Sequence, residues 1–272
     1  MLIVNYFYIL LNLQLIEINR CAVSLEYFIE ETNLAVNAKD VFEIYSKAMN
    51  KLGFDKIVYT FITDHIKIGQ TAGHGILSNY PSDWLSYYHE KGYQKIDPVM
   101  RKGLYRGPAF SWKHLEETSC FKMEQTLFMR EAEDAGLLSG VGIPLHRDIT
   151  DIAGVGIASS SKININKNLL SVIQFLTEQF HNVYCDLIKE NSYSSPTVTL
   201  TDKEIEVLKW LANGKNNYEI SDILNISVSA IKFHVQNIYT KLSANDRILA
   251  VTKAIRMGII PIETIGIKTI LD

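Results

Sequence analysis

Side chains suited to reading DNA recur along residues 227–242, where the sequence predicts a helix. One side of this helix forms an apolar stripe at helical spacing: Ile231, Val235, Ile238 and Leu242. The opposite face and its flank carry seven residues without a carboxylate: Ser229, Lys232, Phe233, Gln236, Asn237, Thr240 and Lys241. Because base edges in the major groove present hydrogen-bond donors and acceptors, this face suits insertion there. On this pattern alone, a helical bundle with a solvated polar face is the alternative.

Positive charge is concentrated around this helix, although the whole chain is slightly acidic. The 272 residues hold 27 Lys and Arg against 30 Asp and Glu, so no strong overall field favours nucleic acid or a membrane. Residues 225–260 nevertheless contain five basic residues and one acidic residue, whereas residues 200–224 contain three and five. This local excess is what contacts with DNA phosphates require.

The cysteines and histidines argue against a metal site. Cys21, Cys120 and Cys185 lie far apart without a CxxC pair, and the seven histidines form no HExxH motif. The cysteine usage predicts no disulfide framework, and a reducing cytoplasm as the setting. The sequence also lacks a GxSxG motif. We therefore expect no metal, no cofactor, no catalytic residue and no enzyme activity.

Four predicted helices in the C-terminal part of the chain would position the polar face. They span about 201–214, 217–224, 227–242 and 246–258. Thr201 and Glu204 form a capping box at the start of the first helix, and glycines follow the first and the last. The second and third helices are joined by a very short turn, which predicts a helix-turn-helix.

A Ser- and Asn-rich stretch with one proline divides the chain at residues 191–197. We expect an N-terminal extension over 1–22, a first domain over 23–190, a linker over 191–198 and a second domain over 199–272. The apolar run Leu2–Leu15 is too short for a bilayer span, which needs about 20 residues. Arg20 follows that run instead of preceding it, which disfavours a signal peptide.

The first domain alternates between helical and strand patterns. Helical spacing covers 41–52, 82–90, 97–102, 122–135 and 168–189, and strand patterns cover 56–62, 141–145 and 152–158. The last two strands flank a polar turn and predict a hairpin. Because helices stand at both ends with strands between them, we expect an α-β-α sandwich, and an α+β fold class for the chain.

The second domain resembles the DNA-binding domain of LuxR-type transcription regulators over residues 200–242. The family pattern LTxxExEVL…G…EIxxxLxISxxTVKxHxxNIxxKL is met at many fixed positions, among them Glu204, Leu208, Gly214, Lys232, His234 and Asn237. Ile231 stands where the family usually has valine. The resemblance implies DNA binding as a homodimer through the helix-turn-helix.

The first domain resembles the autoinducer-binding domain of the same family. The family's W-x3-Y, DP and W positions are occupied by Trp84, Tyr88, Asp97-Pro98 and Trp112, and Tyr80 precedes Trp84 by four residues. This resemblance to quorum-sensing regulators implies an N-acyl-homoserine lactone as ligand. A phospho-acceptor receiver domain is disfavoured, because Asp64 is the lone acidic residue just after the strand of 56–62.

The resemblance implies a role for each of these side chains. The indole N–H of Trp84 would donate to the lactone carbonyl, and Asp97 would accept from the amide N–H as a charge-assisted bond. The Tyr80 hydroxyl would donate to the amide carbonyl. Tyr88 and Trp112 would be aromatic walls of the site or, alternatively, ordinary core residues. Taken alone, an Asp before a proline is more simply a turn or helix cap.

Three further positions, Gly140, Gly156 and Leu85, bear on the expected structure of the site and on its preference among ligands. Gly140, which the family also has, is expected to be structural and to allow close approach of strands. Gly156 stands near a position where several members carry a Ser or Thr donor, so Tyr80 would be the only side-chain donor to the amide carbonyl. Leu85 follows Trp84 where some members have an arginine that reaches a 3-oxo group. A strong preference for 3-oxo ligands is therefore not expected.

Together these features predict a cytoplasmic, ligand-responsive transcription factor without membrane attachment. The expected partners are double-stranded DNA with an inverted repeat, the lactone and a second copy of the chain, with RNA polymerase as a further candidate. One alternative is a ligand-independent regulator whose pocket is filled by side chains. Another is a lactone-processing enzyme fused to a DNA-binding module, in which Asp97 and Tyr88 would be catalytic.

Overall fold

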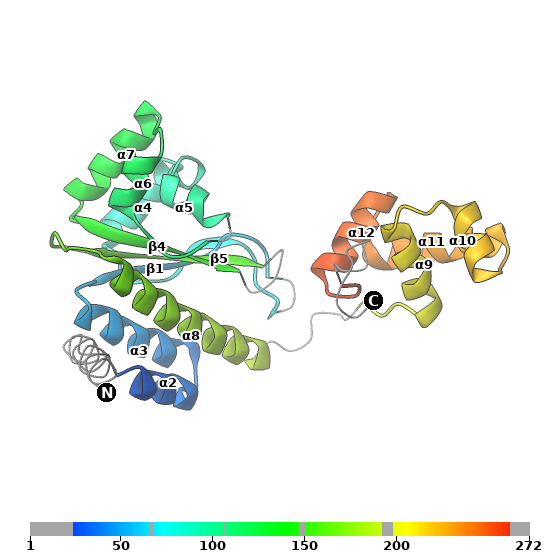
Figure 1. The fold of residues 1–272 in the computed structure, drawn as a ribbon, viewed down its shortest axis with the longest axis horizontal. Helices are drawn as coiled ribbons and strands as arrows, with labels where there is room; N and C mark the ends of the chain where they lie inside the picture. The colour runs from blue at the N-terminus through cyan, green and yellow to red at the C-terminus, as the bar shows by residue number, and fades with distance from the viewer. Residues whose placement is uncertain (1–23, 66–67, 106, 147–150, 192–197, 262–272) are drawn as a thin grey trace, which may run out of the picture. The chain divides into compact units, whose positions relative to one another are not determined.

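The computed structural model describes residues 24–65, 68–105, 107–146, 151–191 and 198–261 (Figure 1). The chain divides into two compact units, Met1–Ser192 and Tyr193–Asp272. The expected N-terminal extension, residues 1–22, lies outside the described residues, as do most of the expected linker and the centre of the polar turn between the hairpin strands.

An antiparallel sheet forms the centre of the first unit. Its strands are β1 (Lys56–Phe61), β2 (Gly73–Ser78), β3 (Phe110–Ser111), β4 (Ser139–His146) and β5 (Ile152–Ser159). Their order in space is β2-β1-β5-β4-β3, and each neighbouring pair is antiparallel. β4 and β5 pair from Ser139↔Ser159 to His146↔Ile152, which confirms the predicted hairpin.

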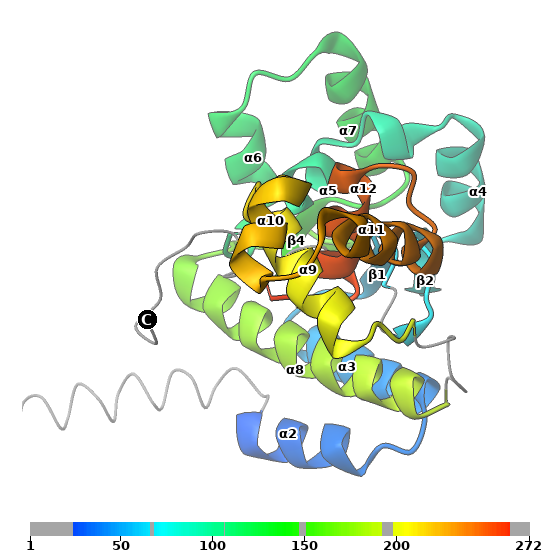
Figure 2. The same cartoon turned by 90° about the vertical axis from the view of Figure 1, so that its right-hand side faces the viewer.

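One face of the sheet is covered by α3 (Ala38–Lys51) and α8 (Lys167–Asn191), and α2 (Leu25–Leu34) packs on the outer side of these two helices (Figures 1 and 2). Alternate residues of the strands point into the core on this side, among them Tyr59, Ile143 and Val155. The ring of Tyr45 on α3 stacks on Phe180 of α8 with centroids 4.5 Å apart. This side of the sheet holds the main apolar core of the unit.

The other face is covered by shorter helices: α4 (Ser82–Glu90), the 3₁₀ turn η2 (Tyr93–Lys95), α5 (Pro98–Gly103), α6 (Trp112–Thr118) and α7 (Met123–Asp134). A second, aromatic-rich cluster lies on this side, with Trp84, Tyr88 and Phe128 as members. Helices on both faces of one sheet confirm the α-β-α sandwich. The sequence analysis did not predict α2, α6, β2 or β3.

The second unit consists of α9 (Asp202–Ala212), α10 (Asn217–Leu224), α11 (Val228–Leu242) and α12 (Arg247–Arg256) in its described part. The capping box of Thr201 and Glu204 is present at the start of α9. Asn225 adopts a left-handed conformation with φ 50° between α10 and α11, and the Ser227 hydroxyl caps α11. The helix-turn-helix is confirmed.

Within the described ranges, no helix is long and apolar enough to cross a membrane. The same residues bring no three His, Cys, Asp or Glu side chains together as a metal site. Cys120 is exposed and Cys185 is buried, and neither forms a disulfide with another described residue.

Candidate functional site

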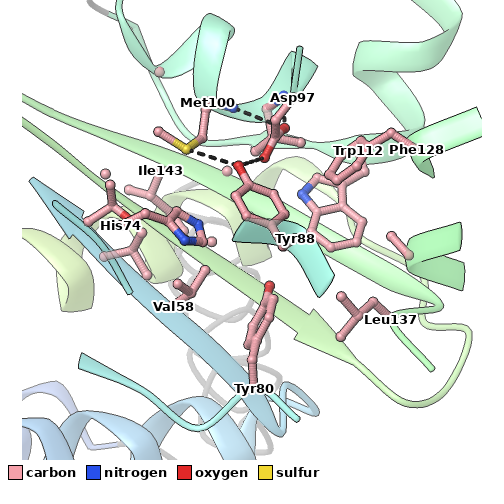
Figure 3. A pocket seen from close by; sticks show the side chains of 18 of the residues that line it. Val58, His74, Tyr80, Tyr88, Asp97, Met100, Trp112, Phe128, Leu137 and Ile143 are labelled. Atoms are coloured by element: carbon pink, nitrogen blue, oxygen red, sulfur yellow. Dashed lines mark hydrogen bonds between the residues drawn. The ribbon is translucent and has the colours of Figure 1, made fainter. Parts of the chain in front are cut away.

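A pocket of about 710 Å³, counted with its opening to solvent, lies between the sheet and the short helices of the first unit. Its lining includes all five side chains for which a ligand role is expected: Tyr80, Trp84, Tyr88, Asp97 and Trp112. Tyr80 precedes α4, Trp84 and Tyr88 lie one turn apart on α4, and Asp97 and Trp112 stand at the starts of α5 and α6. The sequence spacing therefore brings these residues to one cavity, and Figure 3 shows four of them, Tyr80, Tyr88, Asp97 and Trp112.

Small residues on the sheet create the space for this pocket. In register across four strands lie Val58 on β1, Gly156 on β5, Gly142 on β4 and Phe110 on β3. All four line the pocket, and the two central ones have no side chain. A Cβ atom at Gly142 would lie 2.5 Å from the Phe110 ring, so glycine there lets the ring cross the strand.

Asp97 is both a helix cap and a pocket residue, so the two readings of this position are compatible. Its Oδ1 atom accepts the backbone N–H groups of Val99 and Met100, 2.7 and 3.2 Å away, at the start of α5. Its Oδ2 atom accepts the Tyr88 hydroxyl at 3.0 Å. Burial raises the pKa of Asp97 to about 6 despite these hydrogen bonds, because a low-dielectric site disfavours the charged form.

Two buried donors in the pocket have no hydrogen-bond partner among the described residues: the Tyr80 hydroxyl and the Trp112 indole nitrogen. A Cβ atom at Gly156 would lie 3.6 Å from the Tyr80 oxygen, so the tyrosine hydroxyl occupies the region that a side chain at 156 would reach. An unmet buried donor costs about 1–3 kcal/mol. These groups therefore favour a ligand that supplies acceptors.

Trp84 and Tyr88 are buried within an aromatic cluster, with exposed fractions of 7% and 2%. The Trp84 ring lies 6.1 Å from that of Phe128 and 6.5 Å from that of Tyr88. Phe128 comes from α7 and also lines the pocket. Both packing and contact with a ligand are thus compatible with the positions of these rings.

Gly140 accommodates an indole and not a neighbouring strand. A Cβ atom there would lie 2.2 Å from Cε2 and 2.3 Å from Cδ2 of Trp112, so this ring rests directly on the glycine backbone. The expectation of a structural glycine holds, but its cause differs from the close strand approach that we expected. Gly140 therefore holds the Trp112 wall of the pocket in place.

Gly140→Ala should lower the free energy of unfolding by about 1–3 kcal/mol, because the added methyl group displaces the indole from a packed position. Gly154→Ala on β5 is the matched control, since its Cβ would meet its nearest atoms at 3.5 and 3.6 Å, an ordinary contact. Urea denaturation of the full-length variants measures both effects. Equal losses in the two variants would contradict the role assigned to Gly140.

The sequence analysis missed His74, which lines the pocket from β2. Its ring stacks on Tyr88 with centroids 4.4 Å apart and an interplanar angle of 11°. Because β2 was not predicted, nothing in the sequence pattern placed this histidine on the sheet. The apolar residues Met100, Phe128 and Ile143 were also missed as pocket residues, since isolated apolar side chains carry no signal for a site.

On α11 the structure separates the two faces as the sequence predicted. Ile231, Val235, Ile238 and Leu242 are buried against the rest of the unit. Of the seven expected DNA-facing residues, Asn237 is half-buried. The other six are exposed: Ser229, Lys232, Phe233, Gln236, Thr240 and Lys241. Phe233 is 64% exposed, so its ring lies open on this face of α11.

Three of the five basic residues counted around α11 have partners inside the unit. Lys241 Nζ lies 2.7 Å from Oε2 of Glu204, a carboxylate that is 3% exposed. Arg247 donates to the Lys215 carbonyl, and Lys253 to the carbonyls of Leu242 and Ser243 at the end of α11. The net charge of residues 225–260 therefore overestimates the number of cations that are free to contact DNA phosphates.

Lys232 is the contrasting case among these cations. It is exposed on α11 and has no ion pair or hydrogen bond with any described residue. Its position one turn before Gln236 places it on the flank of the polar face. Lys232 is therefore better placed than Lys241 to meet a phosphate.

Lys241→Met should lower the stability of the second unit by about 1–3 kcal/mol, because Glu204 would keep a buried charge without its cation. Burial raises the pKa of Glu204, but hydrogen bonds from Lys241 and Thr201 outweigh it and lower the pKa below its usual value. Amide hydrogen exchange of α9 and α11 in the full-length chain measures the loss. Lys203→Met, which breaks an exposed ion pair with Glu206, is the control and should have almost no effect on stability. Similar losses of stability in the two variants would contradict the role assigned to Lys241.

Both units match known protein families. The family described as "Autoinducer binding domain" matches residues 37–183. The family described as "Bacterial regulatory proteins, luxR family" matches residues 198–254. The first match covers the described part of the sandwich from α3 into α8, and the second covers α9 to α11 and most of α12.

Relatives with the same two parts align over most of this chain. The "HTH-type quorum-sensing regulator RhlR" of Pseudomonas aeruginosa is 30% identical over 232 residues, 82% of this chain and 91% of RhlR. The "Transcriptional activator protein LuxR" of Aliivibrio fischeri is 26% identical over 243 residues, 86% of this chain and 94% of LuxR.

A crystal structure of Escherichia coli SdiA has a similar fold, with a TM-score of 0.67 at 22% identity, over 86% of this chain and 96% of SdiA. SdiA in complex with octanoyl-rac-glycerol gives a TM-score of 0.66 over 86% and 94% of the two chains, again at 22% identity. The sandwich with its pocket, the helix-turn-helix and the family matches lead to one conclusion: the chain belongs to the LuxR family of quorum-sensing transcription regulators, with an autoinducer-binding domain followed by a DNA-binding domain.

Proposed function

We propose that the chain binds an N-acyl-homoserine lactone in the pocket of its first domain and an inverted-repeat DNA site through α11, and that the ligand controls DNA binding. The observation that carries the proposal is the pocket, where unpartnered donors and a buried carboxylate acceptor converge in apolar surroundings. We assign the first domain to 23–190 and the second to 199–272, and we place the protein in the cytoplasm with its DNA target.

In the proposed complex the polar groups of the lactone meet three side chains. The Trp84 indole N–H donates to the lactone carbonyl, the amide N–H donates to Oδ2 of Asp97, and the Tyr80 hydroxyl donates to the amide carbonyl. Support comes from the free Tyr80 hydroxyl and from Asp97 Oδ2, which accepts one hydrogen bond from Tyr88 and can accept another. Tyr88 and Trp112 form the walls.

Lactone affinity should rise about tenfold between pH 5 and pH 7. The pKa of Asp97 is raised to about 6 in the ligand-free pocket by burial, whereas the ligand N–H favours the carboxylate and lowers this pKa. Protonation below pH 6 therefore competes with binding. Burial also lowers the pKa of His74 to about 4 and raises those of Tyr80 and Tyr88, so none of these titrates in this range.

Calorimetric titration at several pH values measures this dependence, and Asp97→Asn is the control that should abolish it. In the ligand-free protein the sign is reversed: a raised folded-state pKa means that the Asp97 contribution to stability falls as pH rises from about 4 to about 6. An affinity that is constant or falls between pH 5 and pH 7 would contradict the assigned role of Asp97.

On DNA we propose that two copies of the chain place their α11 helices in successive major grooves. Half-sites would then lie about 10 base pairs apart, or a multiple of that distance. Ser229, Gln236, Asn237 and Thr240 would face base edges, and Lys232 and Lys241 would face phosphates, with Lys241 held by Glu204. The exposed Phe233 ring suits contact with a thymine methyl group.

The alternative of a lactone-processing enzyme receives less support from the pocket geometry. Its candidate catalytic residues, Asp97 and Tyr88, bond to each other, and Asp97 also caps α5. A binding role uses these groups as they stand. The alternative of a ligand-independent regulator is disfavoured by the cavity and by the buried polar atoms that are left without partners.

Mass spectrometry of small molecules extracted from the protein tests the proposal directly. The chain is purified from a host that produces a range of acyl-homoserine lactones. We expect about one lactone per chain in the wild type and much less in an Asp97→Asn variant expressed in parallel. Soluble wild-type protein without any lactone would overturn the proposal, and stoichiometric hydrolysis products in its place would favour the enzyme.

A further inference from the structure

One buried polar atom of His74 has no hydrogen-bond partner in the described part of the protein and none in the proposed ligand head group. His74 lies on β2 and lines the pocket, and its Nδ1 atom is buried without a hydrogen-bond partner among the described residues. The three polar groups of the lactone head are assigned to Tyr80, Trp84 and Asp97. His74 therefore has no role in binding that head group.

The imidazole is held in a defined orientation. It stacks nearly parallel on the Tyr88 ring, with centroids 4.4 Å apart, and the His89 ring meets it edge-on at 5.3 Å. The Tyr88 hydroxyl at the end of the same ring donates to Asp97. His74 therefore lies beside the part of the pocket that follows the Asp97 subsite, where the start of an acyl chain would run.

The Thr60 hydroxyl also lines the pocket, but it accepts the Gly75 N–H and does not bond His74, so the free His74 nitrogen needs a partner from the ligand. Figure 3 shows the ring beside Val58 and Met100, on the side of Tyr88 away from Trp112. A buried polar atom without a partner costs about 1–3 kcal/mol. An unsubstituted hydrocarbon chain would leave that cost in place, whereas an oxygen on the chain would remove it.

The imidazole is neutral in this environment. Burial first, and the neighbouring His89 second, lower the pKa of His74 to about 4. A neutral imidazole carries one donor nitrogen and one acceptor nitrogen, and Nδ1 takes either role according to the tautomer. A hydroxyl group can bond both tautomers, but a keto oxygen bonds only the one with a proton on Nδ1.

We propose that His74 selects acyl-homoserine lactones with a hydroxyl group on carbon 3 of the acyl chain, by a hydrogen bond between that hydroxyl and Nδ1. This inference rests on the proposed function and specifies its ligand. Carbon 3 is the first substitutable position after the methylene that follows the amide carbonyl, and thus lies close to the Asp97 subsite. Leu85 offers no donor, and Trp112, whose indole nitrogen also lacks a partner within the described ranges, lies on the other side of Tyr88 in Figure 3, so His74 is the residue placed to contact the acyl substituent.

Dose–response curves with three lactones of equal chain length test the proposal: unsubstituted, 3-hydroxy and 3-oxo. The full-length chain drives a reporter from its own target promoter, and the concentration for half-maximal response is measured. For the wild type we expect the 3-hydroxy lactone to act at about tenfold lower concentration than the unsubstituted one, with the 3-oxo lactone between them.

Three variants separate hydrogen bonding from packing. His74→Phe keeps a ring for stacking on Tyr88 and should abolish the preference, while its response to the unsubstituted lactone is retained or improved. His74→Asn restores a polar group near the Nδ1 position and should keep part of the preference. His114→Phe, at an exposed position outside the pocket and away from His74, should leave the preference unchanged.

A wild type that responds equally to all three lactones would overturn the inference about His74 and leave the proposed function intact. A His74→Phe variant that keeps the full preference would also overturn it. If His74→Phe responds to no lactone, His74→Asn decides. A preference in His74→Asn that is within twofold of that in His114→Phe would then overturn the inference. A wild type that responds to no lactone would instead refute the proposed function.

Discussion

Asp97→Asn should raise the lactone concentration for half-maximal response by roughly 10- to 100-fold. The side-chain oxygen of asparagine can still accept the Val99 and Met100 N–H groups, so the cap of α5 is preserved. Its amide nitrogen replaces Oδ2 and then faces the ligand N–H, donor against donor. Loss of a hydrogen bond to a charged group costs about 1.5–3 kcal/mol, which sets the expected range.

Trp112→Phe is the comparison, because this residue is assigned to the pocket wall and not to the ligand head group. Phenylalanine keeps part of the ring over Gly140 and removes a donor that has no partner in the ligand-free structure. We expect a shift well below that of Asp97→Asn in the same reporter assay. Equal dose–response curves for the two variants would refute the assignment of Asp97 to the amide N–H.

Gln236→Ala should relax the base preference of the DNA-binding domain, whereas Lys232→Ala should weaken binding to all sequences alike. The Gln236 side chain is exposed on the face opposite Ile231 and Ile238, and its amide can bond adenine in a bidentate way. Such a contact is worth about 1–3 kcal/mol of discrimination between bases. A phosphate contact through Lys232 carries no base information but releases counterions, so its loss should reduce the log–log salt slope by about 0.9.

Titrations of matched and scrambled half-sites at several salt concentrations distinguish these effects. Lys241→Ala is less suitable for the salt measurement, because its ion pair with Glu204 would mix a change in stability with a change in phosphate contact. Lys232 avoids this ambiguity. Full discrimination in Gln236→Ala, or an unchanged salt slope in Lys232→Ala, would show that α11 docks in another orientation.

The helices and the central strands could be predicted from sequence because their signals are local. Thr201 and Glu204, three residues apart, form the capping box at the start of α9. Gly53, with φ 95°, follows the end of α3. The alternation of β5 and the spacing of the buried stripe on α11 are equally local. The expected ligand residues also met in one pocket, because family spacing fixes their places on α4, α5 and α6.

The features that were missed depend on contacts between distant segments. β2 contains two glycines in six residues, and its strand conformation depends on pairing with β1. β3 has just two residues and exists through its pairing with β4. His74 lies on β2, and the indole–Gly140 contact joins α6 to β4, so neither could be placed from a one-dimensional pattern.

The number of cations available for DNA phosphates could not be predicted from a count of charges, for a related reason. The sequence shows how many cations follow residue 225 but not which of them the fold uses for itself. Arg247 and Lys253 bind backbone carbonyls, and Lys241 neutralises a buried carboxylate. Partners for these cations lie between 10 and 37 residues away in the chain. A local window therefore cannot reveal them.

The most direct test of the account is a DNA titration of the full-length chain with and without lactone. The DNA is a duplex selected from random sequences by the lactone-treated chain, and binding is followed by fluorescence anisotropy at one fixed salt concentration. If the lactone controls DNA binding, the two affinities must differ, and by reciprocity the DNA must change the lactone affinity by the same factor. We expect a difference of at least fivefold that vanishes in Asp97→Asn; superimposable curves for the wild type would contradict ligand control of this regulator.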